Sequence, residues 1–194
     1  LYTPNQQDQL FKLTYRFNMG KLHNRKIEIA LAYLDYLATK TKSAEIIGKQ
    51  FYQLACTYTV TVTDQLTTIS LNGLQENFSK AAGLLEELIT QSVPDQAALD
   101  ALIDRLIKAR VNSKTNRDII MNALNNYALY GERNPYNDVL SNAELKNITA
   151  AEMIDLLHQL FSYEHQVLYY GPEKADRIQM AISQIHTPRG QQLA

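Results

Sequence analysis

Several features that would assign a function quickly are missing from this sequence. Its single cysteine, Cys56, excludes an internal disulfide framework and a four-cysteine zinc site. Its seven glycines are dispersed, so the sequence has no glycine-rich loop of the Walker or dinucleotide-binding type. It also has no Gly-x-Ser-x-Gly motif of a serine hydrolase. No apolar run reaches the length of about eighteen residues that a membrane-spanning helix needs.

The sequence also lacks an excess of charge of either sign. Lysine and arginine number 19 against 20 acidic residues, which gives a formal net charge of -1. This balance provides no electrostatic attraction toward nucleic acid or an anionic membrane, so we expect neither as a partner. The composition is otherwise that of a globular protein, with 45% hydrophobic and 20% charged residues in a chain of 194 residues. This length suits one well-packed domain.

The two ends of the sequence look like those of an excised segment. The chain begins Leu1-Tyr2-Thr3-Pro4, with no initiator methionine and no signal segment. Residues 186–194 are typical of a linker or tail. We therefore expect a single domain over residues 1–185, cut from a longer polypeptide. The sequence assigns no compartment, because a targeting signal would belong to the missing part.

Strict alternation of apolar and polar residues predicts the strands. Residues 10–17 alternate in this way, which is typical of a half-buried strand. Residues 57–63 alternate threonine with branched or aromatic residues, and an extended pattern resumes over residues 66–72. Asp64-Gln65 lies between the two and predicts a hairpin turn. A further short strand is expected over residues 166–170.

Helical periodicity predicts the rest of the fold. Residues 24–38 are apolar nearly all round, which indicates a buried helix with Ile27, Leu31 and Leu34 in the core. Further helices are expected over residues 43–56, 76–93 and 172–184. Other helices are expected to begin at residues 95, 141 and 149, and one more is expected to end at Gly131. Because helices cluster after a hairpin, the fold class is α+β, with a mainly antiparallel sheet covered by helices on one face.

The side chains most often used in catalysis form no convergent pattern along the chain. Cys56 lies between an apolar helix and a strand, where a buried core thiol is expected. None of the histidines His23, His158, His165 and His186 has another three or four residues away, so no helical metal face forms from histidine. We expect a surface or capping role for His158 and His165, which flank a helix end.

Two further groups favour structural roles. Glu86 and Glu87 are adjacent on a helix and so face two directions, which indicates a solvated helix face. The sequence holds 12 tyrosines, and no basic residues are interleaved with them as they would be on a base-stacking surface. We therefore expect Tyr127, Tyr130 and the pair at 169–170 to pack in the core or at an interface.

The order of the motifs resembles one family of zinc peptidases. The matching pieces are Phe11-x-Leu13-x-Tyr15-x-Phe17-x-x-Gly20, residues 30–37 and 43–63, Tyr130-Gly131-x-x-Asn134-Pro135-Tyr136, and Leu168-Tyr169-Tyr170-Gly171-Pro172. Together they resemble a domain of the pitrilysin/insulinase/mitochondrial-processing-peptidase-type zinc metallopeptidases, over about residues 1–185. The resemblance implies the LuxS/mitochondrial-processing-peptidase-like metallohydrolase fold.

The chain departs from this family at each position that would hold zinc. Active members carry His-x-x-Glu-His on the buried helix, with two zinc ligands and a glutamate that polarises the attacking water. The matching positions here are Ala32-x-x-Asp35-Tyr36. The third ligand of the family is a glutamate further on, and the corresponding segment, residues 109–114, contains no acid. We therefore expect no catalytic residue, no cofactor and no metal site in this chain.

The resemblance implies a non-catalytic copy of a repeated domain. It would help form a peptide-binding chamber with a catalytic half carried elsewhere, and zinc would sit in that half. The expected partners are the catalytic half and a peptide substrate. The alternative is a structural interaction module in an assembly that has lost peptidase activity. A third reading, an independent small-molecule enzyme, needs a convergent polar cluster that the sequence does not indicate.

Overall fold

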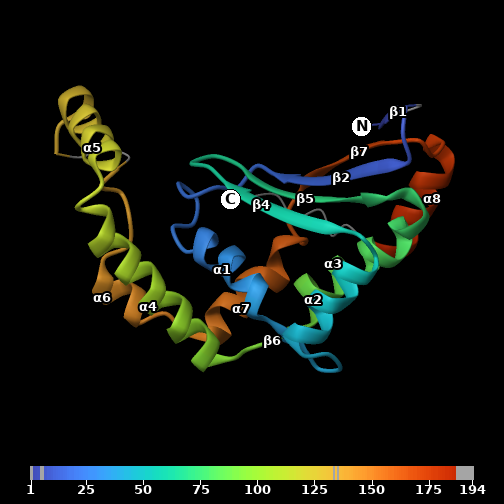
Figure 1. Cartoon of the computed structure of the whole chain (residues 1–194), viewed down its shortest axis with the longest axis horizontal. Helices are drawn as coiled ribbons and strands as arrows, with labels where there is room; N and C mark the ends of the chain where they lie inside the picture. The colour runs from blue at the N-terminus through green and yellow to red at the C-terminus, as the bar shows by residue number, and fades with distance from the viewer. Residues whose placement is uncertain (1, 5–6, 133, 135, 187–194) are drawn as a thin grey trace. The chain divides into compact units, whose positions relative to one another are not determined.

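A computed structural model of the protein describes residues 2–4, 7–132, 134 and 136–186 (Figure 1). These residues form two compact units. One unit joins the chain up to Pro94 with the chain from Ala151 onward, and the other is Asp95–Ala150. The sequence-based prediction of one domain over residues 1–185 stays a prediction, because compactness does not test whether the two units fold as one.

A five-stranded sheet forms the frame of the first unit, in the order β1-β7-β2-β5-β4. Neighbouring strands are antiparallel, except that β1 and β7 run parallel. The strands are β1 (Tyr2–Pro4), β2 (Leu10–Phe17), β4 (Thr57–Val62), β5 (Thr67–Leu74) and β7 (His165–Gly171). The predicted strands over 10–17, 57–63, 66–72 and 166–170 are therefore confirmed to within two residues at either end. The α+β class with a mainly antiparallel sheet is confirmed with them.

Alternation along β2 decides which face of the sheet is covered. Phe11, Leu13, Tyr15 and Phe17 are buried, whereas the intervening side chains are exposed or only half-buried. Successive side chains of a strand point to opposite faces, so one face carries the core. Figure 1 shows helices α1, α2, α3 and α7 on a single side of this sheet. One-sided coverage was the expectation from sequence.

The helices of this unit begin and end close to their sequence signals. They are α1 (Ile27–Tyr33), α2 (Ala44–Gln53), α3 (Phe78–Gln91), α7 (Ala150–Leu160) and α8 (Ala175–Ile185), with one-turn 3₁₀ segments η1 (Leu34–Tyr36) and η2 (Gln75–Asn77). Ser43 caps α2 by accepting a hydrogen bond from the backbone N–H of Ile46. The helix stops near residue 53 rather than 56, because Ala55 adopts a left-handed conformation with φ of 48°.

The predicted helix over residues 24–38 is shorter than expected at both ends. The backbone carbonyl of Gly20 accepts from the N–H groups of His23 and Asn24, so the chain still turns there before α1 begins. At the other end the chain becomes extended at Leu37, with ψ of 141°. The extension allows β3 (Ala38–Thr39) to pair with β6 (Ser92–Val93). These two-residue strands were not predicted, since two residues establish no periodicity.

The second unit is helical, and the side chains that cap the starts of its helices are ones that the sequence indicates. It contains α4 (Gln96–Ser113), α5 (Arg117–Tyr130) and α6 (Asn142–Lys146). Asp95 caps α4 by accepting from the N–H of Ala98 at 3.0 Å. Ser141 and Glu144 form the expected capping box at α6. The motif that begins at Tyr130 includes Pro135, which lies outside the described residues.

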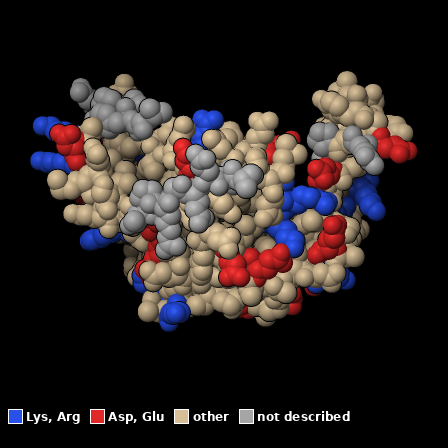
Figure 2. All heavy atoms as spheres, turned by 180° about the vertical axis from the view of Figure 1, so that it is seen from behind, with Lys and Arg blue, Asp and Glu red and all other residues tan. Residues whose placement is uncertain are grey.

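None of the helices among the described residues has the length and apolar content needed to cross a bilayer. On the face drawn in Figure 2, acidic and basic side chains are interspersed, and neither sign gathers into a continuous field.

Core packing makes a direct prediction for the helix that carries the replaced zinc motif. Leu34 is 1% exposed, so truncation to alanine should lower the free energy of unfolding by about 2–5 kcal/mol through lost burial and a cavity. Urea unfolding of Leu34→Ala measures this. Leu22→Ala, at a site that is 66% exposed, is the matched control and should change the value by less than about 0.5 kcal/mol. A loss of that small size for Leu34→Ala would place the helix outside the core.

Candidate functional site

The positions that would hold zinc in the resembled family lie on the exposed side of α1 and η1. Glu28, Ala32 and Asp35 are exposed and follow one another at spacings of four and three residues, so they form a single stripe. Tyr36 is half-buried. The remaining sides of α1 pack into the core, as the sequence predicted. Ala32 and Asp35 therefore take no part in core packing.

Asp35 has a specific partner from the sheet. The hydroxyl of Tyr58, on β4, donates a hydrogen bond to Asp35 Oδ1 at 2.7 Å. Burial, and then this bond to the carboxylate, raises the pKa of Tyr58 well above its ordinary value of 10.0, so the hydroxyl stays protonated and remains a donor. Asp35 is therefore hydrogen-bonded on the exposed side of the helix.

The donor set at this site does not fit a catalytic zinc ion. Zinc in a peptidase needs three protein ligands and one open coordination position. The Ala32 side chain has no donor atom, and one oxygen of Asp35 already accepts from Tyr58. Arg110, in the segment aligned with the third ligand, donates instead to the carbonyl of Leu140 at 2.7 Å and to Asn142 Oδ1 at 3.0 Å. Among the residues that the structure describes, no three histidine, cysteine or acidic side chains lie close enough together to hold a metal ion.

Cys56 is a core residue, as the sequence predicted. It is 3% exposed, and its thiol donates to the carbonyl of Leu54 at 3.2 Å. A Cβ atom added at Gly73 would overlap the Cys56 sulfur, so the two backbones pack closely there. Burial raises the pKa of the thiol, which disfavours the nucleophilic thiolate. The geometry thus supports a packing role.

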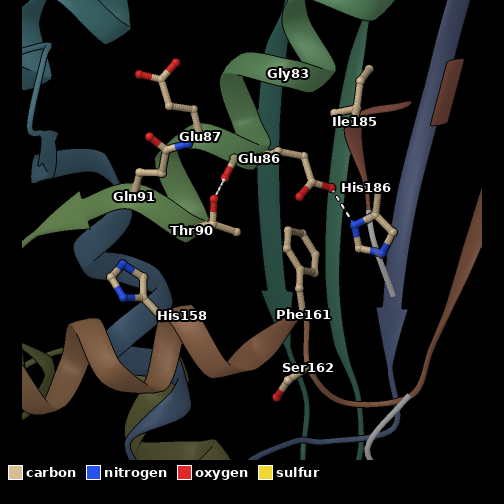
Figure 3. Close-up of a pocket in the computed structure, with 10 residues that line it drawn as sticks. All are labelled: Gly83, Glu86, Glu87, Thr90, Gln91, His158, Phe161, Ser162, Ile185 and His186. Atoms are coloured by element: carbon tan, nitrogen blue, oxygen red, sulfur yellow. Dashed lines mark hydrogen bonds and ion pairs between the residues drawn. The ribbon is translucent and has the colours of Figure 1, made fainter. Parts of the chain in front are cut away.

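The structure brings together a polar cluster that the sequence did not reveal. Glu86 lies on α3 and is only 8% exposed, while its neighbour Glu87 points away and pairs with Lys42 at 2.5 Å (Figure 3). Glu86 Oε1 lies 2.7 Å from Nδ1 of His186, the residue that follows α8. The prediction of a solvated face is therefore wrong for Glu86, because a tertiary partner from the far end of the chain covers it. The two carboxylates do face two directions, as expected.

His186 also connects this carboxylate to a second histidine. Its Nε2 lies 2.8 Å from Nε2 of His165, the first residue of β7. Nδ1 of His165 in turn lies 2.7 Å from the backbone carbonyl of Tyr163. The predicted surface or capping role for His165 did not include this contact with a second histidine. His186, where the predicted tail begins, is 5% exposed, and the domain boundary at residue 185 stays a prediction. Residues 187–194 of the predicted tail lie outside the described residues.

A cavity of about 680 Å³ opens beside this cluster. Figure 3 shows Glu86 and His186 directed toward each other on one side of it and His158, from α7, on the other. Nε2 of His158 lies 3.5 Å from Ser92 Oγ. No sequence signal could have found the cluster, because Glu86 and His186 are 100 residues apart and belong to no shared motif.

Comparison with known proteins gives a clear result for structure only. No protein-family model matches the chain, and no curated protein sequence matches it. Among solved structures, the inactive domain of peptidase M16 from Pseudomonas fluorescens has a TM-score of 0.81 at 17% identity, covering 100% of this chain and 49% of that one. The periplasmic protease PqqL from Escherichia coli has a TM-score of 0.78 at 17% identity, covering 98% of this chain and 22% of that one.

A third solved structure extends the same pattern. The ferredoxin protease FusC, in complex with Arabidopsis ferredoxin, has a TM-score of 0.79 at 16% identity, and the match covers 100% of this chain and 22% of that one. This chain thus spans between about a fifth and a half of the length of these neighbours. The predicted resemblance is confirmed at the level of the fold: the chain folds as a peptidase-like domain of the M16 type.

The donor set predicts the outcome of metal analysis. After incubation with zinc and dialysis against metal-free buffer, the purified chain should retain far less than one equivalent of zinc, because Ala32 contributes no ligand. Elemental analysis of the dialysed protein measures this. Retention of one equivalent, together with its loss in both Asp35→Asn and Tyr36→Phe, would show that a working site had been misread.

Burial of Cys56 predicts slow thiol chemistry. At neutral pH the native chain should react with an aromatic disulfide reagent far more slowly than the same chain in concentrated urea, because the thiol is shielded and its pKa is raised. Absorbance of the released thiolate follows the reaction. Equal rates in the native and unfolded states would mean that Cys56 is accessible, and would reopen a nucleophilic role.

Proposed function

We propose that this chain is a non-catalytic domain of a pitrilysin/insulinase-like zinc metalloendopeptidase. In this role it helps to form a peptide-binding chamber together with a catalytic half carried elsewhere, and zinc belongs to that half. The observation that carries the proposal is a complete peptidase-like fold whose motif positions, Ala32 and Asp35, contain no set of metal ligands. The fold is retained while the chemistry of the site is absent.

The lengths of the structural neighbours support a partner of similar fold. Each of those chains is at least about twice as long as the part that this chain matches. A domain that is one of several in such a protein needs a surface on which the next domain packs. Such a surface is usually an exposed apolar patch of several side chains.

Helix α5 provides a surface of this kind within the second unit. Ile120, Leu124 and Tyr127 recur at spacings of four and three residues and are all exposed, so they form an apolar stripe. Between Ile119 and Tyr130 the helix carries no charged residue. Isolated exposed apolar side chains are common on proteins, but an uncharged helix with a continuous stripe is typical of an interface. We assign this stripe to contact with a neighbouring peptidase-like domain.

The alternative is a structural interaction module in an assembly without peptidase activity. It shares the fold, the lost motif and the stripe on α5 with the leading proposal. The difference lies in the partner, which carries an intact His-x-x-Glu-His motif in one case and not in the other. The test therefore has to include the partner.

Reconstitution with the rest of the parent polypeptide tests the proposal. The chain alone should not cleave a mixture of quenched fluorescent peptides, and addition of the remaining half should restore zinc-dependent cleavage. Leu124→Glu, which puts a charge on the stripe at a site 55% exposed, should weaken the complex at least tenfold. Leu129→Glu is the matched control, because residue 129 is 75% exposed and lies about 180° around the same helix from the stripe.

Each outcome separates the possibilities. A complex without cleavage, from a partner lacking the zinc motif, favours the structural module. Cleavage by this chain alone contradicts both proposals. Equal effects of Leu124→Glu and Leu129→Glu on association would remove the stripe from the interface while leaving the assignment of the domain intact.

A further inference from the structure

The hydrogen-bond distances within the cluster of Glu86, His186 and His165 determine how many protons the three side chains hold. The Tyr163 carbonyl can only accept, so Nδ1 of His165 carries a proton and donates it. The two Nε2 atoms of His165 and His186 are 2.8 Å apart, a distance that requires one proton between them, since two bare lone pairs would repel. The 2.7 Å contact between His186 Nδ1 and Glu86 holds one more.

Counting these positions gives three protons for the carboxylate and the two imidazoles. Two neutral imidazoles supply two ring protons, so the third is an extra one, which resides either on the imidazole pair beside an ionised Glu86 or on Glu86 itself. In both cases the three side chains together carry no net charge. A buried ionisable cluster is tolerated in this balanced state, because an unpaired buried charge is costly.

We propose that Glu86, His186 and His165 form a three-proton latch that fastens the end of α8 to α3 and β7 and that opens when His165 takes up a fourth proton. A fourth proton places N–H groups on both facing Nε2 atoms, which replaces their hydrogen bond with a repulsive contact between like charges. The end of α8 then loses its attachment through His186. The latch is a property of this chain alone and does not depend on the proposed peptidase role.

The groups around the latch make His165 the place where the fourth proton enters. From β2, Tyr15 faces Glu86, and burial followed by the adjacent carboxylate raises the pKa of its hydroxyl far above the ordinary value of 10.0, so it stays protonated. From β5, the neutral Thr67 and Ile69 lie opposite Phe17 and Tyr15. Phe161, which follows α7, packs at 5.0 Å from the His186 ring, centre to centre.

Two neighbouring ionisable side chains, from α3 and α7, have partners outside the latch. Glu87 on α3 pairs with Lys42, and His158 on α7 lies near Ser92. Burial is the main reason that the pKa of His165 lies below its ordinary value of 6.5, and repulsion from His186 lowers it further. The hydrogen bond to the Tyr163 carbonyl and the negative charge of Glu86 act in the opposite direction but do not outweigh burial. These surroundings therefore disfavour the protonated form of His165.

The direction of the pH dependence follows from linkage. His165 binds its proton more weakly in the folded protein than in the unfolded chain, so the unfolded or opened form takes up more protons below about pH 6.5. The stabilising contribution of the latch is therefore complete above that value. It is lost as the pH falls through the lowered pKa of His165.

Amide hydrogen exchange at the end of α8 tests the latch in the full chain. The N–H of His186 donates to the carbonyl of Ile182 at 2.8 Å, so its protection reports local opening. In a metal-chelating buffer, its opening constant, corrected for the intrinsic exchange rate, should rise by up to roughly tenfold per pH unit as the pH falls from about 6.5 to the lowered pKa of His165, and should level off below it. The amide of Leu37, bonded to the carbonyl of Leu34 in the core, should show no matching rise.

Substitutions separate the latch from general acid sensitivity. His165→Asn retains a donor for the Tyr163 carbonyl but cannot take up a proton, so the pH dependence at His186 should disappear and the opening constant should be raised at every pH. His158→Asn, in the same cavity but outside the latch, is the control and should keep the pH dependence of the original chain. Nitrogen-15 NMR of the original chain should show the chemical shifts of the His165 ring nitrogens changing over the same pH range as the opening at His186.

Three outcomes would overturn the latch. The first is an opening constant at His186 that does not change with pH in the original chain. The second is a pH dependence that persists in His165→Asn or disappears in His158→Asn. The third is protection that responds to added zinc rather than to pH, which would identify the two imidazoles as metal ligands. If His165→Asn fails to fold, ring nitrogens of His165 whose chemical shifts change outside the pH range of the opening at His186 overturn the latch by themselves.

Discussion

The two-residue period of strand β2 is the constraint on which the first unit depends. Phe11, Leu13, Tyr15 and Phe17 all point to one face, and β2 pairs with β5 on one side and β7 on the other. Burial of each large apolar side chain contributes about 1.5–3 kcal/mol, whereas an exposed ion pair such as Lys26–Glu152 contributes at most about 1 kcal/mol. The covered face of β2 therefore determines where the helices pack, and surface charge has little influence.

The same face also explains how a charged group comes to be buried on α3. Tyr15 is the member of the buried row that carries a hydroxyl, and it contacts Glu86. Its ring lies 5.4 Å from the ring of His186, centre to centre. Removal of one partner from a buried charged cluster typically costs about 3–5 kcal/mol, because the remaining charge is left uncompensated. Glu86, His186 and His165 thus depend on one another, and through Tyr15 they depend on the register of β2.

Helix α1 separates the residues that pack in the core from those at the positions of the zinc motif. Its core contacts come from Ile27, Leu31 and Leu34, which are buried. The positions that correspond to the zinc motif, Ala32 and Asp35, lie on the exposed stripe of the same helix. Packing and metal binding therefore use different sides of one element. The side chains at these exposed positions therefore contribute little to the free energy of folding, which depends on the buried side.

The sequence by itself determined the elements whose signals are local. Alternation placed β2 and β4, extended patterns placed β5 and β7, and side-chain caps placed the starts of α2, α4 and α6. The residues at the motif positions, Ala32 and Asp35, can also be identified from the sequence alone. Such elements can be recognised from the sequence because periodicity and capping depend on residues that are close together along the chain. Only the tertiary structure decided the pairing of β3 with β6, the stripe on α5 as an exposed surface, and the meeting of Glu86 with His186 across 100 residues. Those features arise from chain segments that are distant in sequence, and their energies exist only once the sheet and helices have brought the segments together.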